Sequence, residues 1–223
     1  MSTNLPPLDT ADLRARGWTS CLLPSNVENF RERLLAFASR LGNPAATRAK
    51  SGLCDTLIPI QGSAANLNSL SRRYSVGEFP LHADTSHWSV PCRYIVLGCL
   101  SSGSARRKTV LLNIDRLPLS SQQFSLLRSA PVRVINGRAS FFSTILAANR
   151  KFIRYDAGCM KPVMSDSVRA LNIFLRRHWL NYLETIDWFE GKVVVIDNWR
   201  LLHGRGPANG DDSDRVLLRI SIR

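Results

Sequence analysis

Short apolar segments, bounded by glycine, proline or polar residues, recur along the 223-residue chain. Segments of this length that are rich in valine, isoleucine and leucine are typical of β-strands. The predicted strands cover residues 18–23, 93–100, 109–113, 132–135, 152–155, 192–197 and 215–222. Many short strands with few helices among them indicate a mainly β protein with flanking helices, whose core is a double-stranded β-helix, or jelly roll.

Apolar residues at helical spacing predict a small number of helices outside this core. The predicted helices cover residues 26–41, 118–129 and 165–186. The first has Ser25 or Asn26 as its cap, and the last has Ser165 or Asp166. Residues 61–76 are polar and predict a loop, which is either a lid over a site or a plain surface loop.

Length and composition limit the class of protein. A chain of this length fits one domain, residues 1–223. It contains no run of about 18 apolar residues, and its first residues lack the pattern of a secretory signal, so neither a membrane span nor export is predicted. The five cysteines are odd in number and have no C-x-x-C spacing, which predicts reduced thiols in a cytoplasmic protein.

The net charge of +13 is the unusual bulk property of the chain. A field of this sign attracts anions, which include nucleic acids and anionic small molecules. The arginines, however, form short scattered clusters, and no nucleic-acid-binding motif accompanies them. We therefore predict a small-molecule ligand and no nucleic-acid partner, with a solvated basic surface as the simplest explanation of the charge.

Two histidines and one aspartate are the candidate metal ligands. His82 and Asp84 are two positions apart after an extended stretch, and residues at this spacing in a strand point to the same face. His203 follows the apolar run of residues 192–197. Two imidazoles and a carboxylate form the facial triad that holds non-haem Fe(II). From spacing alone, a metal triad and two structural histidines are equally compatible with the sequence.

These residues give the chain a family resemblance. It resembles the Fe(II)/2-oxoglutarate-dependent oxygenases of the taurine dioxygenase / clavaminate synthase-like superfamily. Residues 79–84 (FPLHAD) resemble the segment of the first ligands, and residues 197–205 (DNWRLLHGR) closely resemble the segment of the last ligand. The resemblance implies a jelly roll that holds Fe(II) through the two histidines and the aspartate, with 2-oxoglutarate as cosubstrate and O2 as oxidant.

The resemblance also implies a clamp for the distal carboxylate of 2-oxoglutarate. The family places an arginine on the last strand, and Arg215 and Arg219 lie twelve and sixteen residues after His203. A guanidinium pairs with a carboxylate through two parallel hydrogen bonds. We favour Arg215, helped by the hydroxyl of Thr109, and expect Arg219 to reach the same carboxylate or an anionic group of the substrate. Their even separation places both arginines on one face of the strand.

The activity that the resemblance implies is hydroxylation of an unactivated C–H bond in a small polar molecule, such as an amino acid or a natural-product intermediate. Desaturation and cyclisation are alternatives. Arg154 and Asp156 resemble a segment that lies near the substrate in amino-acid-acting members, with Asp156 for an amine or guanidinium and Arg154 for a carboxylate. A turn residue and an ordinary ion pair explain these two equally well.

Two other classes of protein would use the same residues. A binding or regulatory protein on the same scaffold would keep the fold but have no turnover. A zinc hydrolase could bind its metal with two histidines and an aspartate, but nothing near the ligand segments supplies the usual general-base glutamate of such enzymes.

Overall fold

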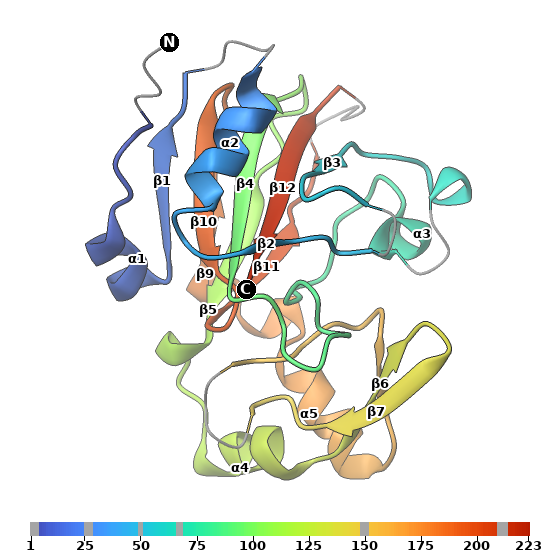
Figure 1. Ribbon diagram of the computed structural model, residues 1–223. Coiled ribbons are helices and arrows are strands. Elements are labelled where there is room, and N and C mark those ends of the chain that lie inside the picture. Colours follow the sequence, from blue (N-terminus) through green and yellow to red (C-terminus); the bar gives the residue numbers. More distant parts are fainter. Residues whose placement is uncertain (1–4, 25–28, 49–50, 66–68, 148–151, 209–213) are drawn as a thin grey trace.

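The computed structural model of the chain describes residues 5–24, 29–48, 51–65, 69–147, 152–208 and 214–223. Two stacked sheets form its upper part, and a smaller lobe lies below them (Figure 1). The helices are α1 (Thr10–Arg16), α2 (Phe30–Ala38), α3 (Leu70–Tyr74), α4 (Ser121–Ser129) and α5 (Ser165–Ile173). No helix in the described part of the chain is long and apolar enough to cross a membrane.

The strands pair in three antiparallel sheets. The strands are β1 (Trp18–Leu22), β2 (Pro44–Ala45), β3 (Asp55–Leu57), β4 (Tyr94–Ser101), β5 (Thr109–Asn113), β6 (Val132–Asn136), β7 (Ala139–Ser143), β8 (Met160–Pro162), β9 (Leu183–Ile186), β10 (Lys192–Asp197), β11 (Leu201–Arg205) and β12 (Val216–Ile222). The largest sheet has the order β1-β10-β4-β12-β2, with β3 also paired to β12. The others are β11-β5-β9 and β7-β6-β8. The prediction of a mainly β protein with flanking helices is therefore confirmed.

The strand β10 shows why the central strands read as uninterrupted apolar runs. Val193 and Val195 pack in the cluster that α1 and α2 cover, whereas Val194 and Ile196 pack in the cluster between the two upper sheets. Alternate residues of a strand point to opposite faces, so a strand with both faces buried needs apolar residues throughout. The two upper sheets thus stack face to face, with the helices on the outer side of the larger one (Figure 1).

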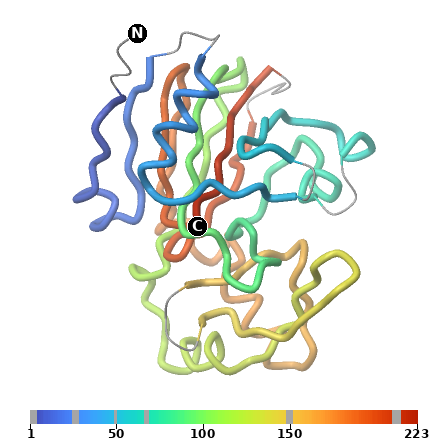
Figure 2. The backbone as a smooth tube through the Cα atoms, in the orientation of Figure 1, coloured from blue at the N-terminus to red at the C-terminus, as the bar shows by residue number. Residues whose placement is uncertain are grey.

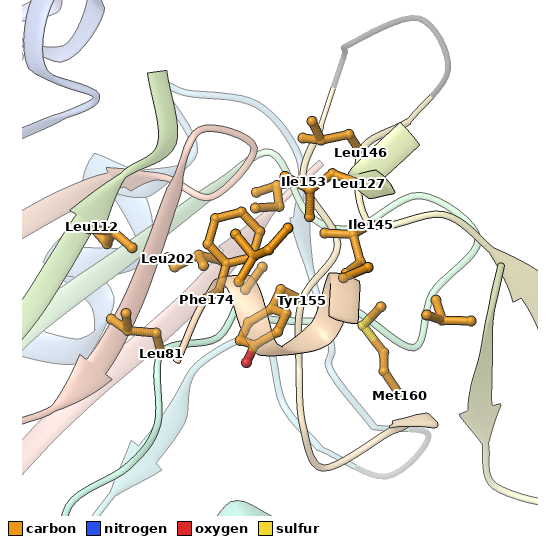
Figure 3. Close-up of a cluster of buried hydrophobic side chains, with 14 of the residues drawn as sticks. Leu81, Leu112, Leu127, Ile145, Leu146, Ile153, Tyr155, Met160, Phe174 and Leu202 are labelled. Atoms are coloured by element: carbon orange, nitrogen blue, oxygen red, sulfur yellow. The ribbon is translucent and has the colours of Figure 1, made fainter. Parts of the chain in front are cut away.

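The lower lobe consists of the β7-β6-β8 sheet with α4 and α5, and the backbone trace shows it beneath the two stacked sheets (Figure 2). Its core is one apolar cluster that also receives Leu112 from β5 and Leu202 from β11 (Figure 3). Leu81 and Tyr155 enter the same cluster from irregular segments. The lobe and the jelly-roll sheets therefore share a continuous core at the place where the candidate ligands lie.

The predicted helix over 165–186 was wrong in its second half. The helix α5 ends at Ile173, two short 3-10 turns follow, and residues 183–186 form β9, which pairs with β5. At the end of α5, the indole of Trp179 turns back and donates to the Ile173 carbonyl at 2.6 Å. Pairing with β5 outweighs the local helical spacing because it completes the smaller upper sheet.

Other predicted elements differ in extent. The strand predicted over residues 152–155 is absent from this described segment. Only Ile153 pairs there, in an isolated bridge with Leu146. The first predicted helix begins at Phe30 and ends at Ala38, and its proposed caps, Ser25 and Asn26, lie outside the described residues. The predicted loop over 61–76 contains α3, while its residues 66–68 also lie outside the described residues.

Candidate metal centre

His82 and His203 lie directly opposite each other on two antiparallel segments. The backbone N–H of each donates to the carbonyl of the other, both at 2.9 Å, and their ring centroids are 4.4 Å apart. His203 belongs to the regular strand β11, whereas His82 forms only an isolated bridge. The extended stretch that carries the first ligands therefore forms a single bridge, and the chain turns immediately after it.

The neighbours of the two histidines determine where the imidazoles point. Leu81, Ala83 and Leu202 are fully buried in the apolar cluster of the lower lobe (Figure 3). Because side chains alternate along extended backbone, the flanked histidines point away from that cluster. Gly204 completes the arrangement, since a Cβ at this position would lie 2.8 Å from the Phe79 carbonyl oxygen. The close approach of the first ligand segment to β11 therefore depends on a residue without a side chain.

Asp84 brings a carboxylate to the same point as the two imidazoles. Its Oδ1 lies 3.6 Å from Nε2 of His82 and 3.9 Å from Nε2 of His203. One ligand atom from each residue lies within 4.8 Å of the others, and all three residues are buried. The two distances exceed those of hydrogen bonds. Three donor atoms therefore face a common point, which is the candidate metal centre.

The protonation of the two histidines suits metal binding. Nδ1 of His82 lies 3.0 Å from the Pro80 carbonyl, so it donates there and leaves the Nε2 lone pair directed at the site. Burial, followed by the nearby His82, lowers the pKa of His203 to about 3, which keeps its imidazole neutral. Burial also lowers the pKa of His82, but the negative charge of nearby Asp84 outweighs this effect, and the net pKa is raised. Metal binding must therefore compete with a proton at His82.

The carboxylate of Asp84 is held in its charged form. Burial alone would raise its pKa, but the positive charge of Arg219 and the nearby imidazoles of His82 and His203 hold it well below the usual range. Two imidazoles and one charged carboxylate, with no further ligating side chain in the described cluster, fit non-haem Fe(II) and leave coordination positions for other ligands.

Asn198 joins the two ligand segments, and the sequence interpretation assigned it no role. Its Oδ1 accepts from the Asp84 N–H at 2.8 Å, and its Nδ2 donates to the Asp84 carbonyl at 3.1 Å and to the Cys92 carbonyl at 2.9 Å. The side chain is fully buried. Because Asn198 lies within residues 197–205, the motif that resembles the family could have indicated it.

Arg154 holds the turn that follows Asp84. Its guanidinium donates to the carbonyl oxygens of Ser86, Trp88 and Ser89, and the side chain is almost completely buried. Burial lowers the pKa of Arg154 to about 10, which still leaves it charged at neutral pH. The guanidinium of Arg154, which was predicted to bind a substrate carboxylate, thus donates its hydrogen bonds to the backbone of this turn instead.

Two further arginines hold the segment that precedes His82. Arg205 donates from Nε to the Gly77 carbonyl at 2.7 Å, and its guanidinium lies 3.7 Å from the ring centroid of Phe79. Arg107 donates from Nη2 to the Val76 carbonyl at 2.7 Å. The first ligand segment is therefore fastened on both sides by buried guanidinium groups that bind backbone carbonyls.

The predicted cosubstrate residues occupy buried positions at the ends of strands. Thr109 begins β5, and its Oγ1 accepts from the indole N–H of Trp188 at 3.0 Å, which leaves the hydroxyl hydrogen for another acceptor. Arg215 is buried and immediately precedes β12. The register between β12 and β4 shifts at Val216, so alternation alone does not place Arg215 on the face of Arg219. The roles of Thr109 and Arg215 in cosubstrate binding stay predictions.

Arg219 and Asp156 lie in different surroundings. Arg219 donates from Nη1 to Oδ2 of Asp84 and from Nη2 to Oδ2 of Asp55, both at 2.9 Å. Asp156 is half-buried, and its Oδ1 accepts from the Gly158 N–H at 2.7 Å in a local turn. Arg219 is thus bound to a candidate metal-ligand residue, a contact that the sequence did not predict.

Comparisons with known proteins agree with this fold. Residues 119–221 match the family described as taurine catabolism dioxygenase TauD, TfdA family. That range includes His203, Arg215 and Arg219 but not His82 or Asp84. No curated protein matches the sequence.

Solved structures with this fold include several iron oxygenases. Asparagine oxygenase in complex with Fe(II), 3-hydroxyasparagine and succinate has a TM-score of 0.77 and 18% sequence identity, and the match covers 95% of this chain and 77% of that one. The non-haem iron oxygenase OrfP with Fe, succinate and (3S)-hydroxy-L-Arg has a TM-score of 0.71 and 20% identity, over 96% and 77% of the two chains. PvcB from Pseudomonas aeruginosa has a TM-score of 0.68 and 17% identity, over 95% and 77%.

The predicted jelly-roll core is therefore confirmed, and so is the resemblance to the Fe(II)/2-oxoglutarate oxygenases of the taurine dioxygenase-like superfamily. The chain has the fold of these enzymes over nearly its whole length, and its C-terminal half carries the TauD/TfdA sequence pattern.

Proposed function

We propose that the protein, as one oxygenase domain over residues 1–223, is an Fe(II)/2-oxoglutarate-dependent dioxygenase that hydroxylates an unactivated C–H bond of a small polar molecule. The observation that carries this proposal is the convergence of His82, Asp84 and His203 on one buried point in this fold. A pair of structural histidines would not need two Nε2 atoms and a charged carboxylate oxygen to face each other without forming hydrogen bonds.

Each ligand residue has a defined role. His82, Asp84 and His203 would hold Fe(II) through two imidazole nitrogens and one carboxylate oxygen. Ferrous iron with 2-oxoglutarate and O2 supplies the oxidising chemistry, in which decarboxylation to succinate accompanies oxygen insertion into the substrate. The protein contributes fixed ligand geometry and a buried surrounding that limits the access of water.

Arg215 and Thr109 are the proposed clamp for the distal carboxylate of 2-oxoglutarate. The bond that Thr109 accepts from Trp188 leaves its hydroxyl free to donate, as a carboxylate partner requires. Arg215 is buried, and a guanidinium in a closed site binds a carboxylate strongly through two parallel bonds.

An amino acid is the first candidate for the substrate. Support comes from the similar structures of asparagine oxygenase and OrfP, whose complexes contain a hydroxylated asparagine and a hydroxylated arginine. Asp156 is the proposed partner of a cationic substrate group. Arg154 is not included as a substrate contact, because its donors bind the turn over 86–89. The proposal extends to a cytoplasmic location, since all five cysteines are free thiols.

The proposal predicts a spectroscopic and a chemical result. Anaerobic addition of Fe(II) and 2-oxoglutarate to the wild-type protein should produce a visible metal-to-ligand charge-transfer band. In air, a screen over free amino acids, sulfonates and carboxylic acids should find a compound that stimulates succinate release and gains one oxygen. Loss of two hydrogens from that compound would indicate desaturation or cyclisation instead. Absence of the band, together with retained zinc and hydrolysis of esters or amides, would overturn the proposal.

A further inference from the structure

Arg219 connects the metal-ligand residue Asp84 to a second carboxylate, Asp55. One guanidinium nitrogen lies 2.9 Å from Oδ2 of Asp84, and the other lies 2.9 Å from Oδ2 of Asp55. Arg219 and Asp55 are direct cross-strand partners in the pairing of β12 with β3. Thr47 donates its hydroxyl to Oδ2 of Asp55 at 2.9 Å. The side chain of Arg219 is therefore held from both ends by partners in different parts of the chain.

This contact distinguishes the two oxygens of the ligand carboxylate. Oδ2 of Asp84 accepts from Arg219, while Oδ1 faces Nε2 of His82 and of His203. A carboxylate with one oxygen fixed by a charged hydrogen bond resists rotation about its terminal torsion. An Oδ2 engaged in this way would be less available as a second donor to a metal ion bound at Oδ1.

Asp55 changes the charge that the site presents to a cation. Asp84 and Arg219 together are neutral, and such a pair attracts a divalent ion weakly. Asp55 adds one negative charge, so the three groups carry a net charge of −1. The side chains of Arg219 and Asp55 are 18% and 16% exposed, which places them where opposite charges are only partly screened. Asp55 thus compensates for the guanidinium that orients the ligand.

We propose that Arg219 and Asp55 form a positioning pair that orients Asp84 for metal binding, in place of the role of Arg219 as a contact for 2-oxoglutarate or for an anionic group of the substrate. The inference rests on the proposed metal site. It assigns Asp55, which no sequence motif indicated, to the function of the centre. Partners that orient metal ligands in this way typically change metal affinity by about 10- to 100-fold when they are removed.

The test uses Co(II) as a probe, without 2-oxoglutarate or substrate. The variants are Asp55→Asn, which removes the charge but keeps an oxygen that can accept from Arg219, and Arg219→Lys, which keeps the charge but loses the planar fork. Co(II) affinity and the visible ligand-field spectrum are measured for each variant and for the wild type. We expect both variants to bind Co(II) roughly 10- to 100-fold more weakly with a changed spectrum. Circular dichroism and thermal unfolding establish that each variant is folded.

The matched control is Glu184→Gln, which removes a charge from another partly buried pair, between Arg16 and Glu184 at 3.1 Å, on a strand that β5 separates from β11. It should bind Co(II) as the wild type does. A contact of Arg219 with 2-oxoglutarate or substrate would leave the metal-only measurements unchanged and weaken only those ligands, which would overturn the inference. If the wild type binds neither Co(II) nor Fe(II), the proposed function fails as well, whereas equal Co(II) binding by wild type and variants defeats the positioning pair alone.

Discussion

The two segments that supply the candidate metal ligands are held in place by different means. His203 lies on β11, whose residues Leu201–Arg205 pair in continuous register with Asn113–Thr109 of β5. Residues 79–84 have a single bridge to β11 and then turn away. Their position depends on side chains that bind backbone, namely Arg107, Arg205, Asn198 and Arg154.

The difference indicates what each ligand segment tolerates. A strand in a sheet is fixed by repeated backbone hydrogen bonds and by apolar contacts, and losing one side chain leaves most of them intact. An irregular segment has its carbonyl groups satisfied by a few buried donors, so the loss of one donor leaves several polar groups unsatisfied. We therefore expect β11 to respond mainly to packing changes and residues 79–89 to respond to the loss of individual polar side chains.

The largest expected effect removes a ligand from either segment. His203→Ala and His82→Ala should each abolish metal-dependent succinate formation, because two remaining donors cannot form the facial triad. Both variants should remain folded, as the imidazoles face the site and not the apolar core. Succinate release and bound iron are measured beside the wild type. Turnover retained by either variant would contradict the triad.

A packing change tests the strand-held segment. Leu202→Ala removes a fully buried side chain next to His203 and should lower the free energy of unfolding by about 3 to 4 kcal/mol. The backbone pairing of β11 remains, so Co(II) affinity at a temperature where the variant is folded should stay close to that of the wild type. Urea unfolding and Co(II) titration measure the two quantities. A large loss of affinity would show that packing also positions this ligand.

A polar deletion tests the loop-held segment. Arg154→Met preserves much of the side-chain volume but leaves the carbonyls of Ser86, Trp88 and Ser89 without their donor, which should cost about 3 kcal/mol. In contrast to Leu202→Ala, this variant should also bind Co(II) more weakly, because the turn after Asp84 loses its anchor. Wild-type Co(II) affinity in Arg154→Met would remove the proposed difference between the segments.

The smallest expected effect concerns the contact between the two segments. In Gly204→Ala the new methyl group would meet the Phe79 carbonyl, which should cost about 1 to 2 kcal/mol as the first segment shifts. Thermal unfolding and the Co(II) spectrum should both change. Gly52→Ala, at an exposed glycine without a positive φ whose Cβ would have no heavy atom within 4 Å, serves as the control for stability. An unchanged Co(II) spectrum in Gly204→Ala would show that the first segment adjusts without moving its ligands.

The secondary-structure predictions were wrong in segments whose conformation depends on pairing with a distant strand or side chain. Residues 183–186 continue an apolar spacing that suits a helix, but they form β9 because β5 offers them a partner. Residues 152–155 look like a strand, but among the described residues only Ile153 forms a bridge, while the Arg154 side chain crosses to the turn after Asp84. The spacing of apolar residues indicates which face of a segment is buried. It does not indicate which other segment forms hydrogen bonds with its backbone.

Composition alone indicated the strands that are buried on both faces, such as β4 and β10, because these need no knowledge of their partners to be recognised. It also indicated the types of the candidate ligands. Which arginine meets Asp84 follows from the folded chain, because Arg219 and Asp84 are 135 positions apart and no local pattern links them. The pairing of β12 with β3 likewise brings Asp55 to Arg219. Contacts of this kind follow from strand order and register, and neither can be inferred from the spacing of residues along the chain.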